Sequence, residues 1–328
     1  MTIQVTIIGL GQIGCSIGLA LAKHKEEILR VGHDKDRYAV NFAKNNDVVD
    51  KHSITLTGAV EHADIIFLAL PFQEIHPILE HICQDLKQGA LVIDTGPLKG
   101  PVLKWIDELL PESCDYIGLT PVVGSDFLNE FEFGPDTAAA DLFKGTLMGI
   151  VGGKNTSEKA VNMAANLVQL LGASPYFSDP AEIDGLMTIS YFLPRLMAAS
   201  LLKVSQDSPG WKEVRKIAGK AFSQVTNPLG QDEIMGALAA GMINNPENTQ
   251  RVINDLIEVL VDFRDQCEST GQDDLEGSLK KLQQGRDLWL DDRRIGSWID
   301  MPKNEIRKSG ILSQLLGFKD RKKAGDKK

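Results

Sequence analysis

A strand, a glycine turn and a helix follow one another at the N-terminus and constrain the fold of the whole chain. Residues 4–8 form a short apolar run with β-branched side chains, which indicates a buried strand. The next six residues read Gly-Leu-Gly-Gln-Ile-Gly, and residues 15–23 are apolar at helical spacing. This order predicts a dinucleotide site, in which the turn brings the phosphates to a helix N-terminus. We expect the cofactor at Gly9, Leu10, Gly11, Gln12, Ile13 and Gly14.

An acidic residue follows the second predicted strand. That strand covers residues 28–32, and Asp34 lies twenty positions after Gly14. A carboxylate at this spacing typically binds the ribose hydroxyls of the cofactor. Because it would repel a 2′-phosphate, NAD is favoured over NADP, although the nearby Lys35 and Arg37 keep NADP open. The alternative is a glycine-rich turn that binds nothing.

Strands alternate with helices as far as residue 171, which predicts an α/β fold with a doubly wound parallel sheet. The turns after Leu70, Asp94 and Leu119 should face the cofactor, because ligands bind at the carboxyl ends of such strands. Leu70, Pro71 and Thr95 are therefore further candidate cofactor contacts, unless these are ordinary turns. Expected strands cover 4–8, 28–32, 54–57, 65–70, 90–94, 116–119 and 146–151, and expected helices 38–45, 75–86, 99–110 and 157–171.

The pattern changes near residue 175, and beyond residue 180 it is helical. We expect a dinucleotide-binding domain at 1–175, an all-α domain at 176–318 and a basic, disordered tail at 319–328. An apolar stripe at helical spacing in the second domain fits either core or a dimer face: Val252, Leu256, Val259, Leu260 and Phe263. Expected helices cover 181–205, with a break at Pro194, and 212–223, 231–242, 247–267 and 274–291.

Composition narrows the possible partners. The net charge of −10 argues against nucleic-acid binding. The first strand begins too early to leave room for a signal peptide, and no uninterrupted apolar run reaches membrane-spanning length. The four scattered cysteines fit a reducing compartment better than disulfides or a metal site. We expect a cytoplasmic protein with no membrane or nucleic-acid partner.

Taken over residues 3–291, the chain resembles the prephenate/arogenate dehydrogenase family. The resemblance rests on the glycine turn, on Ala63-Asp64-Ile65-Ile66 with Pro71, and on Asp94-Thr95-Gly96 with Lys99. It implies a Rossmann domain, then an all-α domain that forms a homodimer, with the active site between the two. It also implies NAD-dependent oxidative decarboxylation in tyrosine biosynthesis. In that reaction hydride leaves the ring carbon that carries the hydroxyl, CO₂ leaves, and the ring becomes aromatic.

Several polar positions of the family are substituted. The family's His-Pro-x-x-Gly segment begins here with Thr120, and its carboxylate-binding Arg is Asn227. All six histidines precede residue 82, so none can act from these places. The candidate catalytic residues are Thr120, Lys99 and Asp184, and the candidates for binding a small anionic substrate are Arg195, Ser125 and Asn227.

Each of these residues also has a structural interpretation. Thr120 fits a loop residue that bonds its own backbone, Arg195 a surface ion pair and Asp184 a helix cap. The leading hypothesis is an NAD-dependent oxidoreductase of this family, acting on prephenate, arogenate or a related carboxylated alcohol. The alternative is a non-catalytic NAD-binding dimer, a sensor or scaffold. A β-hydroxyacid-type dehydrogenase ranks last, because no Lys lies between residues 180 and 202.

Overall fold

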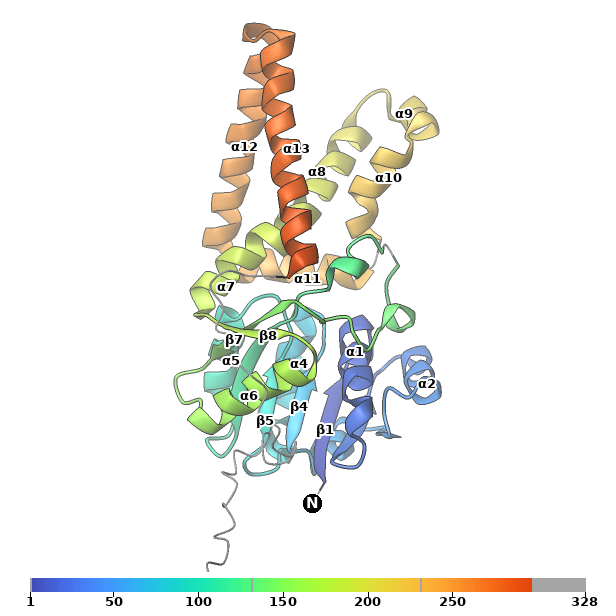
Figure 1. The fold of residues 1–328 in the computed structure, drawn as a ribbon, viewed down its shortest axis with the longest axis vertical. Helices are drawn as coiled ribbons and strands as arrows, with labels where there is room; N and C mark the ends of the chain where they lie inside the picture. Colours follow the sequence, from blue (N-terminus) through green and yellow to red (C-terminus); the bar gives the residue numbers. More distant parts are fainter. Residues whose placement is uncertain (1, 131, 231, 297–328) are drawn as a thin grey trace, which may run out of the picture.

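An eight-stranded sheet forms the base of the molecule (Figure 1). The computed structural model describes residues 2–130, 132–230 and 232–296. The strands are ordered β3-β2-β1-β4-β5-β6-β7-β8, and β1 to β6 are parallel. Their bounds are β1 Ile3–Ile8, β2 Ile28–His33, β3 Lys51–His52, β4 Ile65–Leu68, β5 Leu91–Asp94, β6 Asp115–Thr120, β7 Leu147–Gly152 and β8 Ser174–Phe177.

Helices cover both faces of the sheet, so successive strand residues enter different cores. Ile7 and Phe67 belong to one core, whereas Ile8 and Leu68 belong to the other. This explains the continuous apolar strands, since a sheet covered on both faces has no solvent side. The first core is closed by α1 (Gln12–Leu21), α2 (Arg37–Asn45) and α6 (Glu158–Leu170), and the second by α3 (Leu56–Val60), α4 (Phe72–Ile82) and α5 (Gly100–Leu109).

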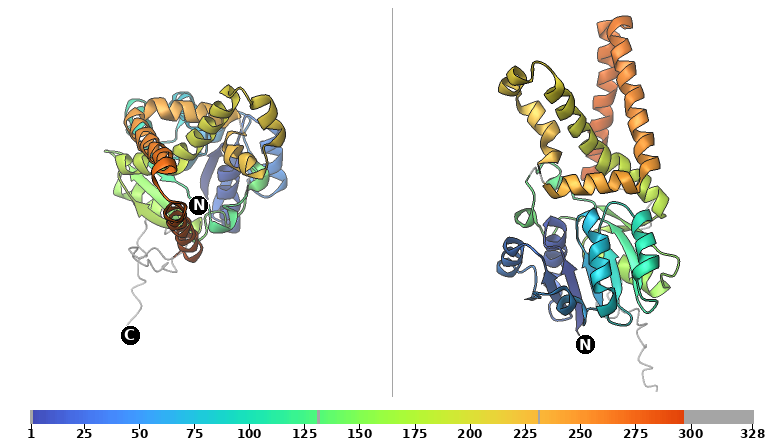
Figure 2. Two further views of the ribbon diagram at one scale, coloured as in Figure 1. Left: turned by 90° about the horizontal axis from the view of Figure 1, so that it is seen from above. Right: turned by 180° about the vertical axis from the view of Figure 1, so that it is seen from behind.

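The C-terminal helices stand on the edge where the parallel strands end. Figures 1 and 2 show two projections, the hairpin of α12 and α13 and the group α8 to α10, with α11 lying between them and the sheet. Ala237 and Leu238 of α11 join the second core, which ties this region to α4. The helices are α7 Pro180–Met187, α8 Leu193–Asp207, α9 Trp211–Ile217, α10 Lys220–Thr226, α11 Asp232–Asn244, α12 Pro246–Ser269 and α13 Gln272–Ile295.

The doubly wound α/β fold is confirmed, with three corrections in the sheet. The strand expected at 54–57 is wrong, because the side chain of Thr55 accepts a hydrogen bond from the Gly58 amide and begins α3. The strand beside β2 lies earlier, at Lys51–His52. The strand β7 is antiparallel to β6, so the sheet is not wholly parallel. A further strand, β8, pairs with β7 and ends the sheet.

The helical region also differs in detail from the predicted pattern. The break expected at Pro194 is a π-helical turn over Thr188–Phe192, immediately before α8. The single helix expected at 212–223 is two helices, α9 and α10, separated at Ala218 and Gly219. The basic tail at 319–328 lies outside the described residues.

The apolar stripe of α12 is mostly uncovered in a single chain. Val252 is buried, whereas Val259 is 48% exposed and Leu260 52% exposed. The core interpretation therefore holds for Val252 alone among these three. The run Pro180–Asp207 is long and apolar enough for a membrane span by length and composition only, and just 17% of its most apolar window is buried.

Candidate active site

The glycine turn after β1 has the shape that a dinucleotide cradle requires. Gly9 has φ +95°, a conformation that favours glycine, and turns the chain beneath Ala69. A Cβ at residue 14 would lie 1.9 Å from the Gly9 carbonyl oxygen, so only glycine lets α1 start this close to the turn. A Cβ at residue 11 would meet no atom within 4 Å, which leaves the space above Gly11 open to a ligand.

A cavity of about 240 Å³ extends from this turn toward the end of β2. It is bounded by Gly11, by Asp34, by the predicted contacts Leu70 and Pro71, and by Glu74 of α4. Asp34 is tied to the turn, because its carboxylate accepts the Leu10 amide at 2.6 Å and the Asp36 amide at 2.8 Å. Five of the predicted cofactor residues therefore line one cavity: Gly9, Gly11, Asp34, Leu70 and Pro71.

Of the remaining predicted cofactor contacts, Ile13 packs against the first core and Gln12 holds a distant segment. The side-chain amide of Gln12 donates to the Thr137 carbonyl at 3.2 Å, and the Ala139 amide donates to the Ser16 hydroxyl at 3.1 Å. The segment 134–139 thus lies over the start of α1, with Pro135 lining the cavity. Nothing local in this segment marks it as part of a cofactor site.

An ion pair between Lys35 and Glu74, which the sequence did not predict, lies at the cavity. Lys35 Nζ lies 2.5 Å from a Glu74 carboxylate oxygen, so the cation next to Asp34 is already paired with a carboxylate. This arrangement keeps the cavity negative where a 2′-phosphate would lie. It supports the expected preference for NAD over NADP.

Lys99 is fully buried at the carboxyl ends of β5 and β6. Its ammonium group donates to Asp94 Oδ1 at 2.8 Å, to the Gly96 carbonyl at 2.8 Å and to the Leu119 carbonyl at 2.7 Å. An ammonium has three donors, and all three are used. Burial lowers the pKa of Lys99, with Asp94 acting in the opposite direction. The arrangement favours a structural role for Lys99 over direct contact with a substrate.

Asp184 of α7 faces the same loop from the helical region. Its two carboxylate oxygens accept the Lys99 amide at 2.6 Å and the Gly100 amide at 3.0 Å, at the start of α5. A carboxylate at a helix N-terminus satisfies unpaired amides and complements the helix dipole. Burial raises the pKa of Asp184 despite these two bonds. Asp184 thus caps a neighbouring helix and not its own, because α7 is capped by the Asp179 side chain, which accepts the Glu182 amide.

Tyr116 completes the network by donating its hydroxyl to Asp94. Burial, together with the charge of Asp94, raises the pKa of Tyr116 well above its ordinary range. A group whose pKa is raised on folding contributes stability below its unfolded pKa, about 10 for tyrosine, and loses that contribution as the pH rises further.

We therefore expect Tyr116→Phe to lower the free energy of unfolding by about 1–3 kcal/mol at pH 7, because Asp94 loses a donor. The difference in unfolding free energy between Tyr116→Phe and the wild type should then narrow above about pH 10, because the wild type loses the contribution of Tyr116 there. Denaturant unfolding of both proteins from pH 7 to pH 10.5 measures it. A difference that stays constant over this range would contradict the prediction.

Thr120 ends β6, directly beside this network. Its side chain is 5% exposed, and its Oγ1 is buried without a hydrogen-bond partner among the described residues. The expected bond to its own backbone is therefore not formed.

Two further predicted residues lie in loops at this edge of the sheet. Ser125, farther along the loop, donates to Asp126 at 3.4 Å. Thr95 stays at the sheet, where its amide donates to the Leu68 carbonyl at 3.1 Å.

Arg195, the predicted substrate-binding cation, lies in the first turn of α8. Its guanidinium lies 3.6 Å above the Tyr191 ring and donates to the Tyr191 carbonyl at 2.6 Å. Its Nε is buried without a partner in the described chain, and burial lowers its pKa. Arg195 forms no ion pair with the described residues, so the interpretation as a surface ion pair is not supported. Asn227 begins a 3₁₀ turn that packs against α8, so the two predicted positions belong to adjoining elements.

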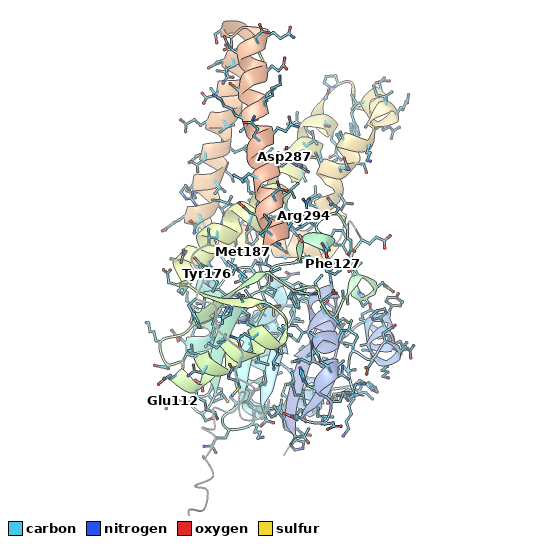
Figure 3. The ribbon with its side chains drawn as sticks, viewed as in Figure 1. Glu112, Phe127, Tyr176, Met187, Asp287 and Arg294 are labelled. Atoms are coloured by element: carbon cyan, nitrogen blue, oxygen red, sulfur yellow. The ribbon has the colours of Figure 1, made fainter. Side chains whose placement is uncertain are left out.

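One residue of this region lies beyond the part of the chain that carried the resemblance. Arg293, in the last turn of α13, donates to the Val123 carbonyl in the loop after β6. Figure 3 shows its neighbour Arg294 at the lower end of α13, near the loop residue Phe127. Only the tertiary structure brings this helix end to the loop.

Comparisons with known proteins agree with this geometry. The family described as "Prephenate dehydrogenase, nucleotide-binding domain" matches residues 17–176. Prephenate dehydrogenase of Bacillus subtilis is 28% identical over 225 residues, which cover 68% of this chain and 59% of that protein. The chain therefore spans less than two thirds of that relative.

Solved structures share the fold over most of the chain. A prephenate dehydrogenase from A. aeolicus, in complex with hydroxyphenyl propionate and NAD+, has a TM-score of 0.74 at 19% identity and covers 87% of this chain and 98% of its own. Synechocystis arogenate dehydrogenase has a TM-score of 0.66 at 21% identity and covers 88% of this chain and 100% of its own. At these identities the likeness establishes the fold.

Proposed function

Because the nucleotide-binding region of this chain belongs to the prephenate dehydrogenase family, we propose that the protein is an NAD-dependent dehydrogenase of tyrosine biosynthesis. Its substrate is a cyclohexadienol with one carboxylate on the ring and one on the side chain, either prephenate or arogenate. The observation that carries the proposal is the open glycine cradle, which faces the carboxyl edge of the sheet where the helical region stands.

The residues of the cavity fit NAD. Gly11 leaves room for a pyrophosphate, the first amides of α1 can hold its charge, and Asp34 lies where ribose hydroxyls would be bound. When bound, NAD+ supplies the acceptor for the hydride that leaves the ring. The ion pair of Lys35 with Glu74 supports NAD rather than NADP.

Two side chains are proposed to contact the substrate. Thr120 has a buried hydroxyl without a protein partner, so it can hydrogen-bond the ring hydroxyl, although its high pKa makes it a weak base. Arg195 is a cation without a carboxylate partner in the described chain, so it can bind a substrate carboxylate. In this proposal Lys99 and Asp184 hold the loops that surround these groups, while Ser125 and Asn227 line the approach.

The test is oxidation of prephenate and of arogenate by the purified protein with NAD+, followed by NADH absorbance. Release of CO₂ with the same stoichiometry as NADH is expected. NAD+ binding without oxidation of either acid would contradict the proposal and favour a non-catalytic NAD-binding protein.

Arg195→Gln should raise the KM for the oxidised acid by roughly tenfold to a hundredfold, because a charge-assisted hydrogen bond to a carboxylate is lost. The kcat should change less, since the contact is present before and during the reaction. Steady-state kinetics measure both. Lys203→Gln is the matched control, because Lys203 is on the same helix but exposed and paired with Asp207. An unchanged KM in Arg195→Gln would contradict this role.

The helical region is proposed to form a homodimer. Apolar side chains on α8, α12 and α13 are exposed in a single chain, which is typical of a surface that a partner covers. These include Val204, Ile257, Val259, Leu260, Leu282, Leu288 and Trp289. Sedimentation of the purified protein at several concentrations tests this proposal.

We further propose a cytoplasmic enzyme that binds neither membranes nor nucleic acid. The apolar run Pro180–Asp207 contains Asp184, whose carboxylate caps α5 within the same chain. That contact holds the run against the sheet domain. The net charge of −10 disfavours nucleic acid.

A further inference from the structure

The end of α13 is joined to the loop that follows β6. Arg293 donates to the Val123 carbonyl, and the same helix packs against the short 3₁₀ turn Ser125–Phe127. This loop starts at Thr120, whose hydroxyl has no partner among the described residues. The last turn of the described C-terminal helix therefore contacts the loop that follows Thr120.

The guanidinium of Arg293 is only partly satisfied by the protein. Its Nε is buried and has no hydrogen-bond partner among residues 2–130, 132–230 and 232–296. Across the same residues no ion pair to Arg293 is formed, and burial lowers its pKa without a carboxylate to oppose the effect. Buried donors are normally paired, so an unpaired one requires an explanation.

A structural arginine in this same protein has a different environment. Arg30 in β2 is fully buried, and its guanidinium meets Asp50 at 2.7 Å and Asp47 at 3.1 Å. Arg30, whose role is structural, is thus paired with two carboxylates. Arg293 keeps its charge half-buried and without an acidic partner in the described chain, so it has already lost much of its hydration before any ligand binds. A charge-assisted bond to an incoming carboxylate would then cost the guanidinium little further hydration.

We propose that Arg293, on the C-terminal helix, binds the side-chain carboxylate of the substrate, the one that decarboxylation leaves in place. It supplies a cation near the loop after β6. Together with Arg195 it gives the site two cations from two different helices, α13 and α8. The inference rests on the proposed function in taking the ligand to be a ring compound that carries a carboxylate.

The test measures binding rather than turnover. Hydroxyphenyl propionate, the ligand of the A. aeolicus structure, keeps a phenol ring and one carboxylate, and its amide has the same shape without the charge. We expect wild-type protein with NAD+ to bind the acid more tightly than the amide by calorimetry. Arg293→Gln should weaken acid binding by roughly tenfold to a hundredfold and leave amide binding within twofold. Arg293→Lys should retain part of the preference for the acid.

The matched control is Arg294→Gln, since Arg294 is the next residue, is 73% exposed and pairs with Asp291. It should bind the acid as the wild type does. The inference is overturned if Arg293→Gln binds the acid within twofold of the wild type, if acid and amide weaken alike, or if the wild type does not distinguish them. A purely structural role would weaken both ligands.

Kinetics separate this inference from the proposed function. If the wild type oxidises neither prephenate nor arogenate, the proposed function fails, while the comparison of acid and amide still decides the role of Arg293. If the wild type oxidises one of them and Arg293→Gln leaves its KM unchanged, the function stands and the inference fails.

Discussion

Lys99→Met is expected to lower the free energy of unfolding by about 3–5 kcal/mol, as removal of one partner from a buried ion pair does in other proteins. The substitution leaves the Asp94 carboxylate in a site with no solvent access. It also strips the Gly96 and Leu119 carbonyls of the donor that joins the ends of β5 and β6. Denaturant unfolding measures the loss, with the same dependence of unfolding free energy on denaturant concentration assumed for both proteins.

The comparison variant is Lys87→Met. Lys87 pairs with Asp64 at 2.5 Å, the same kind of ion pair, but both side chains are partly exposed. Such pairs contribute about 0–1 kcal/mol, so little change is expected. Asp94→Asn combined with Lys99→Met should recover part of the loss, because no unpaired charge then remains buried. If Lys99→Met and Lys87→Met lost the same amount of unfolding free energy, burial would not explain the stabilising effect of Lys99.

Gly14→Ala and Gly11→Ala should separate folding from cofactor binding. At residue 14 the new methyl would lie 1.9 Å from the Gly9 carbonyl, so the turn and α1 must move apart. We expect a loss of about 2–3 kcal/mol in unfolding free energy, together with loss of NAD+ binding. At residue 11 the methyl meets nothing in the protein and the backbone is not strained, so stability should stay within about 0.5 kcal/mol of the wild type.

In Gly11→Ala the same methyl occupies the space proposed for the pyrophosphate. NAD+ affinity should therefore fall at least about tenfold, equivalent to ~1.4 kcal/mol. Thermal unfolding gives the stability change, and fluorescence titration with NAD+ gives the affinity. Normal NAD+ binding by Gly11→Ala would show that the cofactor does not approach the turn at this residue.

The sheet was predictable because its determinants are local. The apolar strands, the glycine turn and the acidic residue at Asp34 each have a sequence signature with a physical cause. The direction of β7 has none, because the apolar run at 147–152 is equally suited to either direction. The strand expected around Thr55 has a related explanation. A β-branched residue beside an apolar one is typical of a strand, but the same hydroxyl can also cap a helix, as it does for α3.

The two halves of the proposed site differ in the same way. The cofactor cavity is made largely of turns that follow strands, so sequence order located most of it. The segment 134–139, which reaches the cofactor cavity, and the proposed substrate residues Arg195 and Arg293 come from distant parts of the chain. No residue pattern encodes that approach. It follows from the packing of α11 against α4 and of α13 against the turn Ser125–Phe127.

The cap of α5 by Asp184 has a consequence for how the chain can be divided. A fragment that ended at Phe177 would contain every strand that the structure describes, but it would leave the amides of Lys99 and Gly100 without their acceptor. It would also uncover the part of the second core that Phe192, Ala237 and Leu238 now close. The sheet and the helices are thus not interchangeable modules. Each supplies part of the other's interior, and a functional transplant of either would have to carry that shared boundary with it.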